Sequence, residues 1–223
     1  LVLFFFIPDH VEHFSKSSIY SILFSSNIYF WQNTNHYFDL DKSLQPLLHT
    51  WSLGVEMQFY IFFGLIFFVF KRNFFILILY LLFIFGLIIS EANVQREMSF
   101  WLMPFRIFEF IIGSIIFFLP KIKINFNTEN ILSLLCLVIL ISFILYYDEK
   151  FNFPGINALV PCFGAALILI TAGKLIFFKK IFINDVLISF GKISYSLYLV
   201  HWPLIIFYRY IKLEPLQNLE KIL

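Results

Sequence analysis

Charged residues are scarce in this chain: Asp, Glu, Lys and Arg together make up only 13% of its 223 residues. Soluble domains carry about a quarter of such residues. Apolar residues make up 61% of the chain and aromatic residues 22%, while the formal net charge is only +2. This composition excludes an ordinary soluble domain, gives no indication of a nucleic-acid partner, and indicates an integral membrane protein.

Cysteine is also rare. Cys136 and Cys162 are the two cysteines, and both lie inside apolar runs. Their spacing does not match a metal-binding pattern, so we interpret them as small apolar core residues. The sequence therefore predicts no metal site.

The chain lacks an initiating methionine, a signal peptide and a flexible linker. Leu1 lies within the apolar run LVLFFFIP, which is too short for a complete span. A basic flank and a small-residue cleavage site are missing, so this run is not typical of a signal peptide. We expect an N-terminally truncated portion of a longer protein. Because no Gly- or Ser-rich stretch divides the chain, residues 1–223 are predicted to form one domain.

Long apolar windows predict the fold class. A span needs about 20 apolar residues to cross a hydrocarbon core of about 30 Å. Six windows of this kind occur, at residues 51–70, 74–90, 100–119, 130–147, 156–173 and 188–210. The sequence therefore predicts an all-α, polytopic transmembrane helical bundle of about six complete spans over residues 51–210.

The segments outside these windows are expected to be partial or interfacial. Residues 1–50 are predicted to hold a partial span and an outer loop, in which Ile19–Trp31 forms an interfacial or re-entrant piece because Ser25, Ser26 and Asn27 interrupt it. Residues 211–223 form a tail. Seven Lys and Arg residues lie in the first, third and fifth loops and two in the others, so the positive-inside rule places residues 8–50 outside.

The first polar cluster lies in HTWSLGVEMQFY, residues 49–60, where a polar segment runs into an apolar one. A charge near the middle of a span costs about 2.5 to 3.5 kcal/mol on insertion scales, which makes Glu56 a functional candidate. Ser52, Glu56 and Tyr60 are four residues apart and share one helix face, with Gln58 roughly opposite. Trp51 is expected near the membrane interface. The alternative is that Glu56 only marks a shallow helix end.

The second cluster is FWLMPFRIFEFIIGS, residues 100–114. Arg106 and Glu109 are three residues apart, so they can pair on one helix face, and such a pair can be structural or functional. Pro104 precedes them and is expected to open the helix locally.

The third cluster is GKISYSLYLVHWPLIIFY, residues 191–208. Ser194, Tyr198 and His201 follow helical spacing and form one polar stripe. Pro203 removes a backbone donor and frees the carbonyl group of Leu199, which predicts a bend near His201. The alternative is that His201 serves only in helix packing.

In this order and at these distances, the three segments resemble the acyltransferase-3 family of integral membrane acyltransferases. The strongest pieces are LLHTWSLGVEMQFY and GKISYSLYLVHWP, PFRIFEFIIGS is weaker, and SSNIYFWQNTNHYFD is similar to the family's outer loop. The resemblance covers essentially the whole chain. A histidine and an arginine pair that family members usually carry in their first spans have no counterpart here, and Met57 stands where a second acidic residue is common.

The resemblance implies acyl transfer, most simply of acetyl, from acetyl-CoA or another acyl-CoA to a hydroxyl of a cell-surface glycan such as lipopolysaccharide O-antigen. It implies a multi-pass protein of the bacterial inner membrane, with the acyl-CoA as substrate and no bound cofactor. It gives catalytic roles to Glu56, Arg106 and His201. Substrate-binding roles fall to His49, Trp51, Ser52, Tyr60, Glu109, Ser194, Tyr195 and Tyr198.

Two other functions are compatible with intramembrane polar residues. A transporter or channel would place broken helices at paired, repeated positions, and the sequence has no such symmetry. A non-catalytic remnant that lacks its first spans would fold, at least in part, without turnover.

Overall fold

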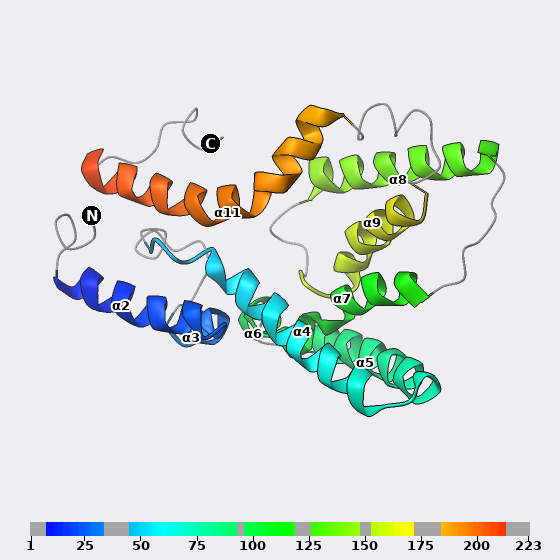
Figure 1. Cartoon of the computed structure of the whole chain (residues 1–223), viewed down its shortest axis with the longest axis horizontal. Coiled ribbons are helices and arrows are strands. Elements are labelled where there is room, and N and C mark those ends of the chain that lie inside the picture. Colours follow the sequence, from blue (N-terminus) through cyan, green and yellow to red (C-terminus); the bar gives the residue numbers. More distant parts are fainter. Residues whose placement is uncertain are drawn as a thin grey trace. The chain divides into compact units, whose positions relative to one another are not determined.

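The computed structural model describes residues 8–33, 45–92, 96–118, 126–147, 153–171 and 184–212, and the regular elements in these ranges are all helices (Figure 1). The chain divides into two compact units. The first unit combines residues 1–62 with residues 191–223, and the second comprises residues 63–190. The all-α prediction is confirmed for the described ranges.

The first unit contains α2 (Pro8–Ile22), α3 (Ser26–Asn33), the first part of α4 (Thr50–Val69) and most of α11 (Asp185–Lys212). The segment Ile19–Trp31, predicted as one interfacial or re-entrant piece, consists of the end of α2, a turn and most of α3. In that turn Phe24 has a φ of 53°, a left-handed conformation that costs a non-glycine residue about 1 to 2 kcal/mol. The amide of Ser25 donates to the carbonyl of Tyr20 at 2.8 Å and closes the turn.

Helix α3 packs closely against one face of α4. The side-chain amides of Asn27 and Gln58 bond reciprocally, with N···O distances of 3.3 and 2.8 Å. The hydroxyl of Ser26 donates to the carbonyl of Thr50 at 2.8 Å. A Cβ added at Gly54 would lie 2.9 Å from Oδ1 of Asn27, so only glycine allows this approach.

We expect Gly54→Ala to lower the thermal stability of the purified protein. Although alanine favours a helix over glycine by about 1 kcal/mol, the added methyl group must displace the buried Asn27, and such overpacking costs about 1 to 3 kcal/mol. Gly64→Ala on the same helix is the matched control, because nothing lies within 4 Å of its added Cβ. Thermal unfolding in detergent compares the two, and equal melting temperatures would contradict the close α3–α4 contact.

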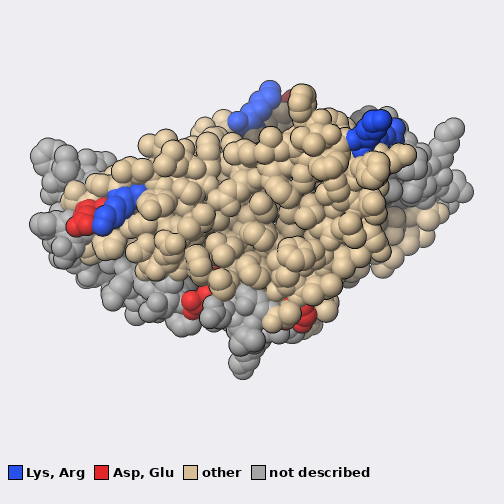
Figure 2. Space-filling view, turned by 90° about the horizontal axis from the view of Figure 1, so that it is seen from below, with Lys and Arg blue, Asp and Glu red and all other residues tan. Residues whose placement is uncertain are grey.

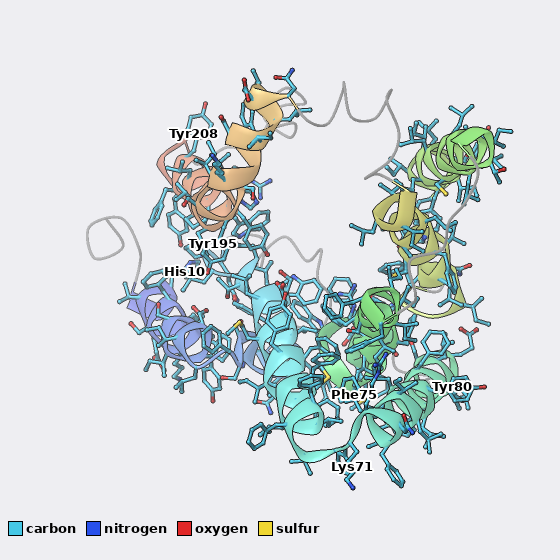
Figure 3. The ribbon with its side chains drawn as sticks, turned by 45° about the vertical axis from the view of Figure 1, so that its right-hand side comes forward. His10, Lys71, Phe75, Tyr80, Tyr195 and Tyr208 are labelled. Atoms are coloured by element: carbon cyan, nitrogen blue, oxygen red, sulfur yellow. The ribbon has the colours of Figure 1, made fainter. Side chains whose placement is uncertain are left out.

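The second unit begins with the last part of α4 and continues through α5 (Arg72–Ala92), α6 (Arg96–Trp101), α7 (Met103–Phe118), α8 (Phe126–Tyr146), a 3-10 turn (Ile156–Ala158) and α9 (Leu159–Thr171). Lys71 lies where α4 turns into α5 (Figure 3). On α5, Phe75 is 1% exposed and meets the rings of Phe63 and Phe67 edge-on, whereas Tyr80 is exposed. The buried rings thus join α4 to α5.

Two glycines allow close helix contacts in this second unit. A Cβ at Gly86 of α5 would lie 2.7 Å from Cγ2 of Ile107 on α7. A Cβ at Gly164 of α9 would lie 2.7 Å from Cδ2 of Leu140 on α8. Small residues at such contacts let helix backbones approach closely, which is the usual way that helices associate in membranes.

The six predicted helical windows all contain helix, but six complete spans are not confirmed. Among the described helices, α4 and α5 are long and apolar enough to cross a membrane. The third window breaks at Leu102, just before Pro104, into α6 and α7. At a rise of about 1.5 Å per residue, α7 is about 24 Å long and α9 about 20 Å, shorter than the hydrocarbon core. Helices α7 and α9 are therefore too short for a complete span. Helix α11 is longer but carries several charged residues.

The predicted orientation stays a prediction. The loop lysines on which it mainly depends lie outside the described ranges: Lys121, Lys123, Lys150, Lys174, Lys179 and Lys180. The start of the predicted partial span, residues 1–7, and residues 213–223 of the predicted tail also lie outside them.

The described surface is predominantly apolar. Figure 2 shows a face in which isolated charged groups interrupt a broad area of uncharged residues. Large apolar side chains are among the most exposed, including Phe68 at 91%, Phe117 at 84% and Ile144 at 75%. Soluble monomers rarely expose continuous apolar surface on this scale, whereas a bilayer would cover it.

Candidate active site

The polar face of α4 predicted from helical spacing is present. The Tyr60 hydroxyl donates to Oε1 of Glu56, one turn earlier on the helix. Ser52, one turn before Glu56, lies 2.5 Å from the hydroxyl of Tyr198 on α11. Gln58 lies on another face and pairs with α3. Helix α4 therefore packs against α3 through Gln58 on one face and contacts α11 through Ser52 on the other.

Two residues of α11 hold the segment 45–49 that leads into α4. The Tyr198 hydroxyl donates to the carbonyl of His49 at 2.5 Å, and Nε1 of Trp202 donates to the carbonyl of Gln45 at 2.8 Å. Because a carbonyl oxygen only accepts, the Tyr198 hydrogen belongs to the His49 bond, and Ser52 is the donor in the Ser52–Tyr198 bond. Residues four apart on α11 thus anchor both ends of this short segment.

The tautomer of His201 follows from its hydrogen bonds. Its Nδ1 lies 2.7 Å from the carbonyl oxygen of Tyr198 and 3.3 Å from that of Leu197. Both oxygens are acceptors, so Nδ1 carries the hydrogen, and in the neutral ring Nε2 keeps a lone pair. An imidazole held in this way is prepared to accept a proton through Nε2.

His49 lies next to His201. The centroids of the two rings are 5.6 Å apart, and the Tyr198 ring is 5.2 Å from His49. His49 is 5% exposed, and neither of its ring nitrogens has a hydrogen-bond partner. Burial, followed by repulsion from His201, lowers the pKa of His49 to about 4. The backbone groups of Leu199 and Pro46 oppose this shift without reaching hydrogen-bond geometry. His49 is therefore neutral at physiological pH.

This lowered pKa predicts a loss of stability in acid. An unfolded His49 would titrate near 6.5 and the folded one near 4, so below pH 6.5 the unfolded state binds the proton more readily. Stability should fall as the pH drops from about 6.5 to 4, by about 2 kcal/mol at pH 5. Thermal unfolding at pH 7.5 and pH 5 measures this, with His49→Leu as the control that lacks the titrating group. Equal acid sensitivity of the two proteins would contradict the assignment.

Arg106 and Glu109 form the predicted ion pair in the second unit. Nε and Nη2 of Arg106 donate to the two carboxylate oxygens of Glu109 at 3.1 and 3.0 Å. The side chains are only 16% and 14% exposed, and the rings of Phe100 and Phe153 lie 5.9 Å from the guanidinium carbon. Such a two-bond geometry neutralises both charges. It confirms the pairing, and the catalytic role of Arg106 stays a prediction.

The other predicted site residues differ in their burial and in their contacts. Trp51 is buried, at 8% exposure, because α4 is already packed at its first turn, and its place near the membrane interface stays a prediction. The Ser194 hydroxyl donates to the carbonyl of Gly191 in its own helix at 2.8 Å, and Tyr195 is 61% exposed. Of the predicted α11 stripe, Tyr198 and His201 face the segment 45–49.

Four residues of this unit were not identified by the sequence patterns: Gln45, Trp202, His10 and Tyr210. Gln45 and Trp202 belong to neither of the predicted polar stripes. On α2, His10, which is labelled in Figure 3, bonds with the Tyr210 hydroxyl of α11. No local signal predicts this contact, because the two residues are 200 positions apart.

In the ranges that the structure describes, no three His, Cys, Asp or Glu residues lie close enough together to hold a metal ion. The chemistry available at segment 45–49 and its neighbours is that of the imidazoles of His49 and His201, hydroxyl groups and the carboxyl group of Glu56. Groups of this kind can bind a hydroxyl and accept its proton.

Comparison with known proteins shows a family. The model of the family described as "Acyltransferase domain" matches residues 2–220. A Haemophilus influenzae protein named "Uncharacterized protein" is 31% identical over 186 residues, which cover 76% of this chain and 76% of that protein. A Staphylococcus aureus protein named "Putative O-acetyltransferase" is 28% identical over 89% of this chain. No solved structure is significantly similar to the chain.

The name of a further relative describes that protein as membrane-bound. A Komagataeibacter xylinus protein with the name "Putative membrane-bound transacylase" is 25% identical over 86% of this chain. The chain spans 36% of the length of the staphylococcal relative and half of the length of this one. With nearly every residue matched by the family model, and with an apolar surface and polar cluster that suit a membrane enzyme, the chain belongs to the acyltransferase family.

Proposed function

We propose that the protein is a membrane O-acyltransferase that transfers an acyl group from an acyl-CoA to a hydroxyl group of a cell-surface glycan. Acetyl is the acyl group that we propose to test first. The family match and the names of the relatives support acyl transfer. Lipopolysaccharide O-antigen is the acceptor that we propose to test first, and the bacterial inner membrane is the proposed location.

The observation that carries this proposal is the geometry around His201. The hydrogen on its Nδ1 is held by the Tyr198 carbonyl at 2.7 Å, which leaves the Nε2 lone pair as the proton acceptor. The second imidazole, His49, lies beside it, and the Ser52–Glu56–Tyr60 face of α4 adds a carboxylate in the same unit. A hydroxyl nucleophile needs a base positioned in this way.

The proposed reaction is a direct acyl transfer. The acceptor oxygen attacks the thioester carbonyl, a C–O bond forms and the C–S bond breaks. The hydroxyl proton passes to Nε2 of His201 and from there to the departing CoA sulfur, so that the products are an ester and CoA thiol. A catalytic role for Arg106, which Glu109 holds in the second unit, is a further part of the proposal.

Heterologous expression tests the proposal. The complete reading frame would be expressed in a bacterial host that lacks its own glycan O-acetylase, and surface glycans would be analysed by mass spectrometry and NMR. We expect new acetyl esters that mild base removes. Good membrane expression without any new ester, on glycan or on other isolated surface polymers, would refute the proposed function.

A further inference from the structure

Buried polar atoms without partners are concentrated in one short segment. Within the part of the chain that the structure describes, five buried side-chain nitrogen and oxygen atoms lack a hydrogen bond. Three of the five belong to segment 45–49: Oε1 of Gln45, and Nδ1 and Nε2 of His49. Buried polar groups in folded proteins nearly always have partners, so a cluster of exceptions marks a candidate binding site.

Backbone hydrogen bonds hold segment 45–49 against α11. Tyr198 and Trp202 bond the backbone carbonyls of His49 and Gln45, which fixes the backbone of both residues against α11. The neighbouring hydrogens are already used. The Tyr198 hydrogen goes to the His49 carbonyl, and the Nδ1 hydrogen of His201 goes to the Tyr198 carbonyl. No nearby group described above remains to donate to the unpaired atoms.

The chemistry of these atoms specifies the ligand. A neutral imidazole has one donor and one acceptor nitrogen. The backbone carbonyls near His49 can serve only its N–H, so its second nitrogen needs a donor, as does the amide oxygen of Gln45. A phosphate or carboxylate ligand offers only acceptors and would be rejected. Among the residues that the structure describes, the groups that act on His49 include no carboxylate to balance an ammonium, so hydroxyl groups are the matching donors.

We propose that Gln45 and His49 form the subsite that binds the hydroxyl-bearing acceptor, a neutral sugar ring whose O–H groups donate to the Gln45 amide oxygen and to the unprotonated nitrogen of His49. This inference rests on the proposed function and assigns its acceptor side to one segment. It also implies that the phosphates of the acyl-CoA bind elsewhere. The acceptor would then lie beside His201, the proposed proton acceptor, because the two imidazole centroids are 5.6 Å apart.

Apolar replacements separate binding from structure. Gln45→Met and His49→Leu remove unpaired buried polar atoms, so thermal stability at pH 7.5 should stay equal or rise. If the atoms bind the acceptor, its KM should rise about tenfold in each variant, while the KM for acyl-CoA stays unchanged. Gln58→Met is the matched control. It breaks the amide pair with Asn27, so it should lower stability and leave the acceptor KM unchanged.

A binding measurement distinguishes failure of this inference from failure of the proposed function. O-antigen polysaccharide freed of its acetyl esters by mild base should raise the melting temperature of the purified full-length wild-type protein, and His49→Leu should lose this shift. Shifts of this kind without any acetylation would support the subsite and refute the reaction. Acetylation with an unchanged acceptor KM in both variants would overturn the subsite alone. Absence of both acetylation and the shift would count against both.

Discussion

Glu56→Gln should reduce acetylation by the full-length protein by about a hundredfold or more, with membrane insertion and thermal stability close to wild type. A positioned acid or base contributes about 10²- to 10⁴-fold to a reaction. Glutamine has nearly the same shape as glutamate, and its amide oxygen can still accept the hydrogen bond that the Tyr60 hydroxyl gives to Oε1. The substitution therefore removes the charge and spares the contact.

Radiolabelled acetyl transfer in membranes, normalised to the amount of inserted protein, measures this effect. Tyr60→Phe is the companion variant, because it removes the hydrogen bond to Glu56 and keeps the carboxylate. We expect it to lose less activity than Glu56→Gln. Undiminished acetylation by Glu56→Gln would exclude Glu56 from any essential role and would favour the view that it only marks a helix end.

The second large effect is expected for His201→Ala, which should lower acetylation by about 10² to 10⁴-fold. The Nδ1 bond of His201 to the Tyr198 carbonyl lies within α11, so its loss leaves the helix contacts of Tyr198 and Trp202 in place. The variant should therefore remain folded. Added imidazole should restore part of the activity, because it supplies the missing proton acceptor.

Packing alone would give a different result for His201. A packing role predicts less protein, a lower melting temperature and no rescue by imidazole. Trp202→Phe provides the structural comparison, because it keeps an aromatic ring and loses the N–H that binds the carbonyl of Gln45. We expect this variant to lose stability with a much smaller loss of turnover.

Local geometry explains why part of the candidate site could be predicted from the sequence. Ser52, Glu56 and Tyr60 share a face because residues four apart align on any α-helix, and the Tyr60–Glu56 bond confirms this. Arg106 and Glu109 pair for the same reason. These contacts require only that each segment be helical, and the apolar runs are sufficient to indicate this.

The number of spans was less accessible to sequence reasoning. An apolar window indicates that a segment is buried in protein or lipid, but it does not show where the helix begins and ends. Pro104 divides one window at Leu102, and α9 ends after 13 residues. Helix length depends on such local interruptions, so the six windows contain helix without all meeting the length of a span.

The sequence by itself determined that the chain is helical and apolar, which family it resembles, and which polar residues share a helix face, because all of these depend on short-range order along the chain. Only the tertiary structure decided that Tyr198 bonds Ser52 from 146 residues away, that Trp202 holds Gln45, and that His49 is buried beside His201. The tautomer of His201 and the unpaired atoms of segment 45–49 follow from those contacts. The physical reason is that a hydrogen bond between distant segments depends on how the helices pack, which no local pattern specifies.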